Sequence, residues 1–196
     1  MKKLPLIMVS ASLFTLVVGS CTTKKASKKK SNSQEISVEE WRGLASKCTY
    51  PELHGAVANI SEERIQDGKS EKGSATLTYT FSDGTWTMAQ EEGDQGVYDV
   101  KYMLGFRASE CLEGYEETLK SSDLTEYNLT WKWYKDLSVR YTGNIGGGST
   151  SSDNYFISGD VYLKFNSDGY LVAAKMLTTA SDGQISLDDE ITISYS

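Results

Sequence analysis

Alternation of apolar and polar residues is the clearest pattern along this chain of 196 residues. Between residues 74 and 81, alanine, leucine, tyrosine and phenylalanine take turns with serine and threonine. A period of two predicts β-strands with one buried side and one side in water. Such strands are typical of antiparallel sheets. The same alternation returns at residues 127–133, 137–142, 157–165 and 191–195.

Two Ser-Asp-Gly triplets, at residues 82–84 and 167–169, predict hairpin turns. Each follows a strand that ends in an aromatic residue, Phe81 or Phe165, and precedes another apolar stretch. Glycine supplies the positive φ that such turns need. The strands on either side of each triplet are therefore expected to be antiparallel neighbours.

Two regions have helical spacing instead. Residues 37–48 begin with a Ser-x-x-Glu capping box and carry apolar residues at helical intervals, with Pro51 just beyond. Residues 97–119 predict one or two helical pieces broken by Gly105 and Gly114. Residues 143–154 are rich in glycine and serine, so we expect a mobile connection between strands there.

This order of elements predicts an α+β fold over residues 37–196, with a curved antiparallel sheet of about eight strands and one or two helices on one face. A chain of this length suffices for one domain. The twelve tyrosines and four tryptophans favour a packed domain over a disordered chain.

The first 20 residues have the plan of a secretory signal. Two lysines follow the initial methionine, residues 4–18 are uncharged and mostly apolar, and small residues follow. The segment ends in Val-Gly-Ser before Cys21, which resembles the lipobox of bacterial lipoproteins. The resemblance implies cleavage before Cys21 and a membrane anchor of fatty acyl chains on its sulfur. Ordinary cleavage at a small-residue site is the alternative.

Residues 21–36 predict a solvated tether, because they hold five lysines and almost no large apolar residue. The first 36 residues carry a net charge of +6, and the rest of the chain carries −13. A domain with this much negative charge repels phosphate backbones. Nucleic acid is therefore excluded as a partner. The tether lysines serve as a plain linker or as contacts to lipid headgroups. The chain is therefore expected to be exported and anchored on the outer face of the cell membrane or in the outer membrane.

The element order and the lipoprotein context together resemble the half-barrel fold of outer-membrane lipoprotein carriers. In that family a curved antiparallel sheet covers helices around an apolar cavity. The resemblance implies a comparable arrangement over residues 37–196, and it rests on fold-level analogy.

No pattern of catalytic or cofactor-binding residues stands out. His54 is the single histidine, and the chain lacks nucleophile-elbow, phosphate-loop and dinucleotide-binding motifs. The acidic residues 182–190 favour a solvated loop over a calcium site. We therefore expect no enzyme activity, no metal and no cofactor.

Cys48 and Cys111 remain once Cys21 carries lipid. An even number of cysteines in an exported domain allows a disulfide, which would stabilise the fold by about 4 kcal/mol by closing a long loop. Two buried thiols on helix faces are the alternative.

Aromatic residues gather on the predicted inward positions of the strands. Most such stripes are core, but a wide sheet with few helices leaves room for an apolar cavity or patch. The leading hypothesis is a non-enzymatic domain that binds an apolar ligand or lipid. The alternative is a structural module that meets another envelope protein through its sheet face or edge. The candidate residues are Tyr79, Phe81, Trp86, Tyr127, Trp131, Trp133, Tyr141 and Phe165.

Overall fold

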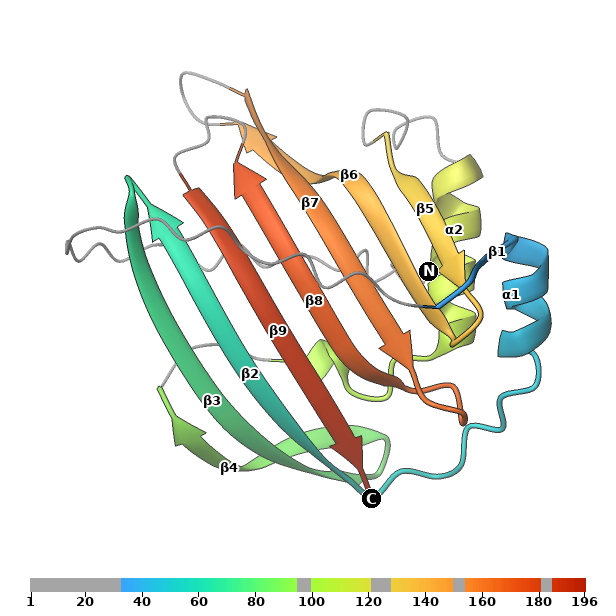
Figure 1. Ribbon diagram of the computed structural model, residues 1–196. Helices are drawn as coiled ribbons and strands as arrows, with labels where there is room; N and C mark the ends of the chain where they lie inside the picture. The colour runs from blue at the N-terminus through green and yellow to red at the C-terminus, as the bar shows by residue number, and fades with distance from the viewer. Residues whose placement is uncertain (1–32, 95–99, 121–127, 150–153, 181–184) are drawn as a thin grey trace.

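The computed structural model describes residues 33–94, 100–120, 128–149, 154–180 and 185–196. Nine strands of these ranges form one antiparallel sheet, and the helices lie on one side of it (Figure 1). The strands are β1 (Glu35–Ile36), β2 (Gly55–Gln66), β3 (Lys69–Ser82), β4 (Thr85–Gly93), β5 (Thr130–Tyr134), β6 (Ser138–Ser149), β7 (Asn154–Phe165), β8 (Leu171–Ala180) and β9 (Ile185–Tyr195). The helices are α1 (Val38–Ala45), the 3-10 helix η1 (Lys101–Met103) and α2 (Ala108–Lys120).

The sheet has the order β1-β5-β6-β7-β8-β9-β2-β3-β4. Strands β2 to β4 and β5 to β9 are two runs of sequential neighbours, and pairing of β9 with β2 joins the runs. The prediction of an α+β fold with a curved antiparallel sheet is confirmed. The ninth strand, β1, lies in the segment that the sequence assigned to the tether, and it pairs with β5.

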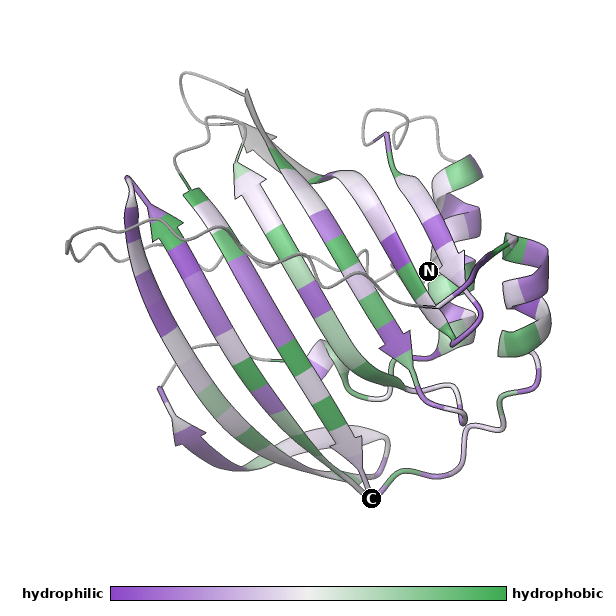
Figure 2. Ribbon diagram, in the orientation of Figure 1, coloured by the Kyte–Doolittle hydropathy of each residue, from purple (hydrophilic) through white to green (hydrophobic). Residues whose placement is uncertain are grey.

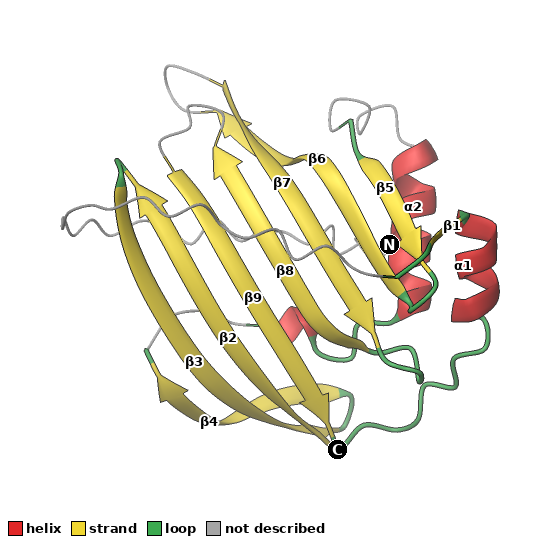
Figure 3. Cartoon of the chain, viewed as in Figure 1, coloured by secondary structure: helices red, strands yellow, loops and turns green. Residues whose placement is uncertain are grey.

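Helix α1 begins where the capping box predicts. The Ser37 hydroxyl accepts a hydrogen bond from the Glu40 backbone N–H at 3.2 Å, and the Glu40 carboxylate accepts one from the Ser37 N–H at 3.0 Å. This reciprocal pair satisfies two backbone donors that no helical carbonyl can reach. Both α-helices lie beside β5 and β6, at one end of the sheet (Figure 3).

The region 97–119 contains two helical pieces, η1 and α2, with Gly105 between them. Gly105 has φ +73°, a conformation that L side chains rarely adopt. Gly114, which was expected to break the helix, lies inside α2. An interior glycine costs about 1 kcal/mol relative to alanine, which packing of the rest of a helix can offset.

Both Ser-Asp-Gly triplets are turns between antiparallel strands. Asp83 and Gly84 have φ +52° and +74° between β3 and β4, values that fit the hairpin turn the sequence predicts. Gly169 has φ +95° before β8, and a Cβ there would lie 2.6 Å from the Cβ of Cys48. Glycine is therefore required at position 169, because a side chain would strain the backbone there and would collide with Cys48.

The glycine-rich segment differs from the prediction. Residues 143–149 continue β6 and pair with β7, instead of forming a connection without regular structure. Pairing of backbone groups supplies hydrogen bonds whatever the side chains are, so a glycine run beside a neighbouring strand can join the sheet. Residues 150–153 of the predicted connection lie outside the described ranges.

Candidate functional site

One face of the sheet, called here the inner face, carries a continuous row of apolar side chains. The row takes one residue from each of seven strands, and all are buried. Apolar and polar bands alternate along the strands in Figure 2, as expected when successive residues point to opposite faces. In order across the sheet, the residues are Trp133, Val139, Leu163, Ala174, Ile191, Ile60 and Ala75.

The opposite, outer face is polar and holds ion pairs. The row next to the apolar one consists of Lys132, Arg140, Tyr162, Lys175, Glu190, Ser61 and Ser74. Lys132 contacts Glu35 at 2.9 Å, and Arg140 forms a two-point ion pair with Asp160. These groups are partly or fully exposed, so each pair contributes little to stability. The outer face is therefore a solvated surface.

The inner face of β5 is the centre of a cluster of aromatic rings. Trp131 and Trp133 are stacked, with ring centroids 5.6 Å apart and planes inclined by 10°. The ring centroids of Trp131 and Tyr141 of β6 are 4.5 Å apart. Tyr115 of α2 lies edge-on to both tryptophans. Aromatic pairs in these geometries contribute about 0.5–1.5 kcal/mol beyond burial of their area. The β5 aromatic cluster comprises Trp41, Phe106, Tyr115, Trp131, Trp133, Tyr141 and Phe165.

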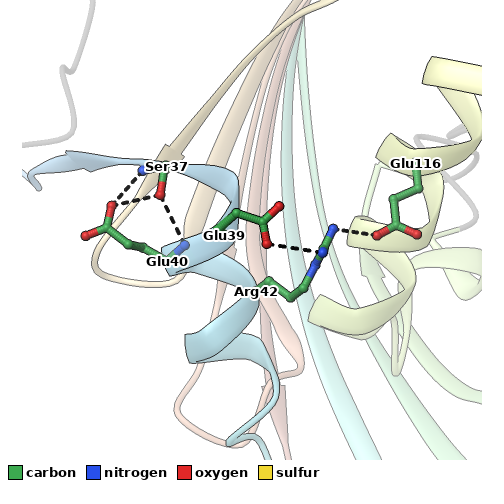
Figure 4. A network of polar contacts seen from close by, with 5 residues as sticks. All are labelled: Ser37, Glu39, Glu40, Arg42 and Glu116. Carbon is green, nitrogen blue, oxygen red and sulfur yellow. Dashed lines mark hydrogen bonds and ion pairs between the residues drawn. The ribbon is translucent and has the colours of Figure 1, made fainter.

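Helix α1 closes the other side of this cluster through Trp41, which has no exposed surface. Its ring lies 4.7 Å from Trp133 and 6.0 Å from Phe165. An ion pair joins α1 to α2, because Arg42 of α1 donates to Glu116 of α2 at 2.7 Å; Arg42 also donates to Glu39 within α1 at 3.2 Å (Figure 4). The helices thus cover the inner face of β5 as a linked pair.

A second group, the β4 aromatic cluster, lies where Trp86 of β4 approaches Tyr195 at the end of β9, with ring centroids 6.4 Å apart. It comprises Tyr50, Phe81, Trp86, Tyr170 and Tyr195. Tyr195 donates to the Leu171 carbonyl at 2.8 Å and accepts from the Gly105 N–H at 3.1 Å. Burial raises the pKa of Tyr195 to about 12. Tyr170 donates to the Pro51 carbonyl at 2.7 Å. These hydrogen-bonded hydroxyls join chain segments, which is a structural role.

The predicted aromatic residues thus divide between two places. Trp131, Trp133, Tyr141 and Phe165 belong to the β5 aromatic cluster, and Phe81 and Trp86 belong to the other. Tyr79 is buried on the inner face of β3, opposite Met88. Tyr127 lies outside the described residues. The sequence did not single out Trp41 and Tyr115, although their helical spacing marked them as inward residues.

Two indole N–H groups of the β5 aromatic cluster have no hydrogen-bond partner within the described part of the chain. They are Nε1 of Trp41 and Nε1 of Trp131, and both atoms are buried. Trp41 is wholly enclosed, whereas the Trp131 side chain is partly exposed. A buried donor without an acceptor costs about 1–3 kcal/mol. Such donors are rare in native proteins and call for an explanation.

The inner face becomes charged toward the turn between β2 and β3. Glu62 follows Ile60 at the next inward position of β2, and Arg64 follows Glu62. Asp189 of β9 lies opposite Glu62 and is 2% exposed. The inner face therefore has an apolar region, which includes both aromatic clusters, and a polar end.

Cys48 and Cys111 are free thiols in the structure. Cys111 is buried on α2, whereas Cys48 is half-buried and lies beyond the end of α1. Burial raises the pKa of Cys111 to about 12. Burial also raises the pKa of Cys48, and the nearby Asp168 carboxylate adds to the effect. Both thiols are therefore poor nucleophiles at neutral pH.

Within the described ranges, no group of three or more His, Cys, Asp and Glu side chains is arranged to hold a metal ion. His54 is exposed, and its backbone N–H donates to the carbonyl of Ser196. No described helix is both long and apolar enough to cross a membrane. In comparisons with known proteins, no family model matches the chain and no curated protein is significantly similar to it.

Proposed function

We propose that this chain is an exported bacterial lipoprotein, held to a membrane by lipid on Cys21, whose domain binds an apolar ligand without catalysing a reaction. The observation that carries the proposal is the apolar row across seven strands of the inner face. The two α-helices lie at only one end of that row (Figure 3). All seven side chains of the row are buried, and Val100, Met103 and Leu104, in and beside η1, belong to the same core. An apolar guest would therefore enter by displacing part of this cover.

Small residues add support on the side of the sheet away from the helices. Ala56 and Ala58 of β2 and Ala75 of β3 are inward positions with a single methyl group each. Side chains this short fill little of the space above the inner face of the sheet. A flexible acyl chain would contact these methyl groups as it would contact lipid.

The attachment of the tether supports uptake of such a ligand at a membrane surface. The Ser33 hydroxyl accepts from the Asp136 N–H at 3.1 Å, and the Gln34 carbonyl accepts from the Lys135 N–H at 2.9 Å. The chain is therefore fixed beside β5 from Ser33 onward. Eleven residues separate Cys21 from Ser33, and even a fully extended chain of that length reaches only about 40 Å. Lipid on Cys21 would therefore keep the β5 aromatic cluster near the bilayer.

Native mass spectrometry of the protein extracted from membranes without denaturation tests the proposal. We expect a bound mass of a lipid or other apolar compound beyond the covalently attached acyl chains. The Cys21→Ser chain, which lacks the covalent lipid, should carry the same bound mass. Absence of bound compound from both forms, together with no uptake of added fatty acyl compounds, would contradict a ligand-binding role.

The alternative, an interaction module, is supported by strand β4, which is an edge of the sheet among the described strands. Trp86 is its one buried residue, and Met88 is 50% exposed. However, an extra residue, Ala89, interrupts the register with β3, and Glu91 and Glu92 follow it. Bulges and charges of this kind discourage pairing with another strand. A photo-crosslinking residue at Met88, compared with one at Asp67, would detect a protein partner at this edge.

A further inference from the structure

The unpaired indole N–H groups point to the chemistry of the ligand. Trp41 and Trp131 contact Trp133 with centroid distances of 4.7 and 5.6 Å, so both donors belong to one cluster. Each is a buried donor without a partner among the described residues. A guest that supplied an acceptor oxygen would recover the free energy that these unpaired groups cost.

We propose that the β5 aromatic cluster is a subsite for a neutral acyl ester, whose carbonyl oxygen accepts a hydrogen bond from Nε1 of Trp131 while its hydrocarbon chain extends along the apolar row of the inner face. This inference rests on the proposed function and specifies its ligand. Trp131 is the donor nearer the surface, because its side chain is partly exposed although its Nε1 atom is buried. A guest would therefore reach this N–H only after a neighbouring side chain moves. Trp41 is the second donor, deeper in the cluster.

The donor set distinguishes an ester from other compounds with apolar parts. A pure hydrocarbon would leave both N–H groups unpaired. A fatty acid carboxylate would bring a charge next to aromatic rings, and burial of an unpaired charge is costly. A sugar would bring hydroxyl donors of its own, which need acceptors that two indole N–H groups do not provide. An ester accepts hydrogen bonds without donating any, which matches the two unpaired donors.

The two cationic side chains next to Trp41 and Trp131 along the chain do not change this assignment. Arg42 of α1 is engaged by Glu39 and Glu116, and Lys132 points to the outer face, where Glu35 pairs with it. Neither cation is therefore free to hold an anionic headgroup at the cluster. These contacts favour a ligand without charge, such as an ester.

The test compares methyl octanoate with n-undecane, which have equal numbers of non-hydrogen atoms, both delivered from cyclodextrin to the Cys21→Ser chain. Affinity is measured for the protein and for its Trp131→Phe variant, which keeps a stacked ring and loses the N–H. Indole N–H resonances of protein with ¹⁵N-labelled tryptophan are followed in parallel. Trp86→Phe, in the β4 aromatic cluster, is the matched control.

We expect the ester to bind more tightly than the alkane and to move the Trp131 indole resonance downfield. The preference for the ester should fall about fivefold in Trp131→Phe, which corresponds to one hydrogen bond, and should persist in Trp86→Phe. Equal preference in all three proteins, with an unmoved Trp131 resonance, would overturn the ester subsite but leave apolar binding intact. Failure of both compounds to bind would instead overturn the proposed function itself.

Discussion

Trp131 and Trp133 lie two residues apart on β5 and stack with their planes inclined by only 10°. Lys132, between them, points to the opposite face and contacts Glu35 of β1 at 2.9 Å. This arrangement follows from the two-residue period of a strand. It places a large apolar surface on one side of β5 and a charged group on the other.

Replacement of Trp133 by alanine should therefore destabilise the domain strongly. Trp133 is 4% exposed and contacts Trp41, Tyr115 and Trp131. Loss of a large buried aromatic side chain costs about 3–5 kcal/mol. Urea unfolding followed by circular dichroism measures the effect, with Lys132→Ala as the matched control. Similar midpoints for Trp133→Ala and Lys132→Ala would contradict the assignment of the inner face.

Stability should fall in acid partly through Asp136, in the turn between β5 and β6. Burial acts to raise the pKa of Asp136, but hydrogen bonds from Ser138 and Ser33 and the nearby Lys164 outweigh it and lower the pKa below its ordinary value of 3.8. A carboxyl whose pKa is lowered by folding stabilises the protein above its ordinary pKa and loses this contribution as the pH falls through the folded value.

Asp136→Asn should consequently be less stable than the unmodified protein near neutral pH, and the difference should shrink below about pH 4. Asp67→Asn, at an exposed position in the turn between β2 and β3, is the control substitution of the same type. Unfolding midpoints in urea across this pH range give the comparison. A constant difference between Asp136→Asn and the unmodified protein would contradict the role given to Asp136.

The thiols give a prediction about chemical labelling. Native protein should react slowly with iodoacetamide at neutral pH, with Cys48 ahead of Cys111, because Cys111 is buried and its pKa is raised to about 12. After unfolding without a reductant, both should be labelled. Mass spectrometry of the peptides detects the label, and a requirement for reductant would show a disulfide instead.

Anchoring is tested by Cys21→Ser. The lipobox-like sequence predicts that this change removes the acyl chains, so an uncleaved or soluble protein should replace the detergent-phase one in a phase-separation experiment. The variant should not incorporate labelled fatty acid. The lysine-rich segment remains, and its weak attraction to anionic lipid should be lost at high salt. Unchanged partition of the variant into detergent, with no loss of labelled fatty acid, would contradict the lipid anchor.

The sequence predicted much of the sheet, because alternation is a local pattern. It missed β1, since two residues are too few to display a period and the pairing of Ile36 with Trp133 joins segments far apart in the chain. It also misread residues 143–149, where pairing with β7 decides the structure. At position 159 of β7 glycine is needed, because a Cβ there would lie 2.5 Å from the side chain of Ile145 and would collide with it. Composition does not reveal this packing requirement.

The candidate site was predicted in part for the same reason. Alternation identified Trp131 and Trp133 as neighbours on one side of a strand. The contacts of Trp41 and Tyr115 with those rings depend on how two helices pack on the sheet, and no local pattern specifies that packing. The unpaired indole N–H groups likewise emerge only from the packed structure.

The central claim, that the inner face binds an apolar ligand, is tested most directly by titration of the Cys21→Ser chain with a dibrominated stearate ester, because bromine quenches tryptophan fluorescence on contact. We predict saturable quenching with about one ligand per chain, and weaker quenching in Trp131→Phe than in Trp86→Phe. Fluorescence that stays unchanged, or that falls linearly without saturation as for tryptophan free in solution, would contradict the claim.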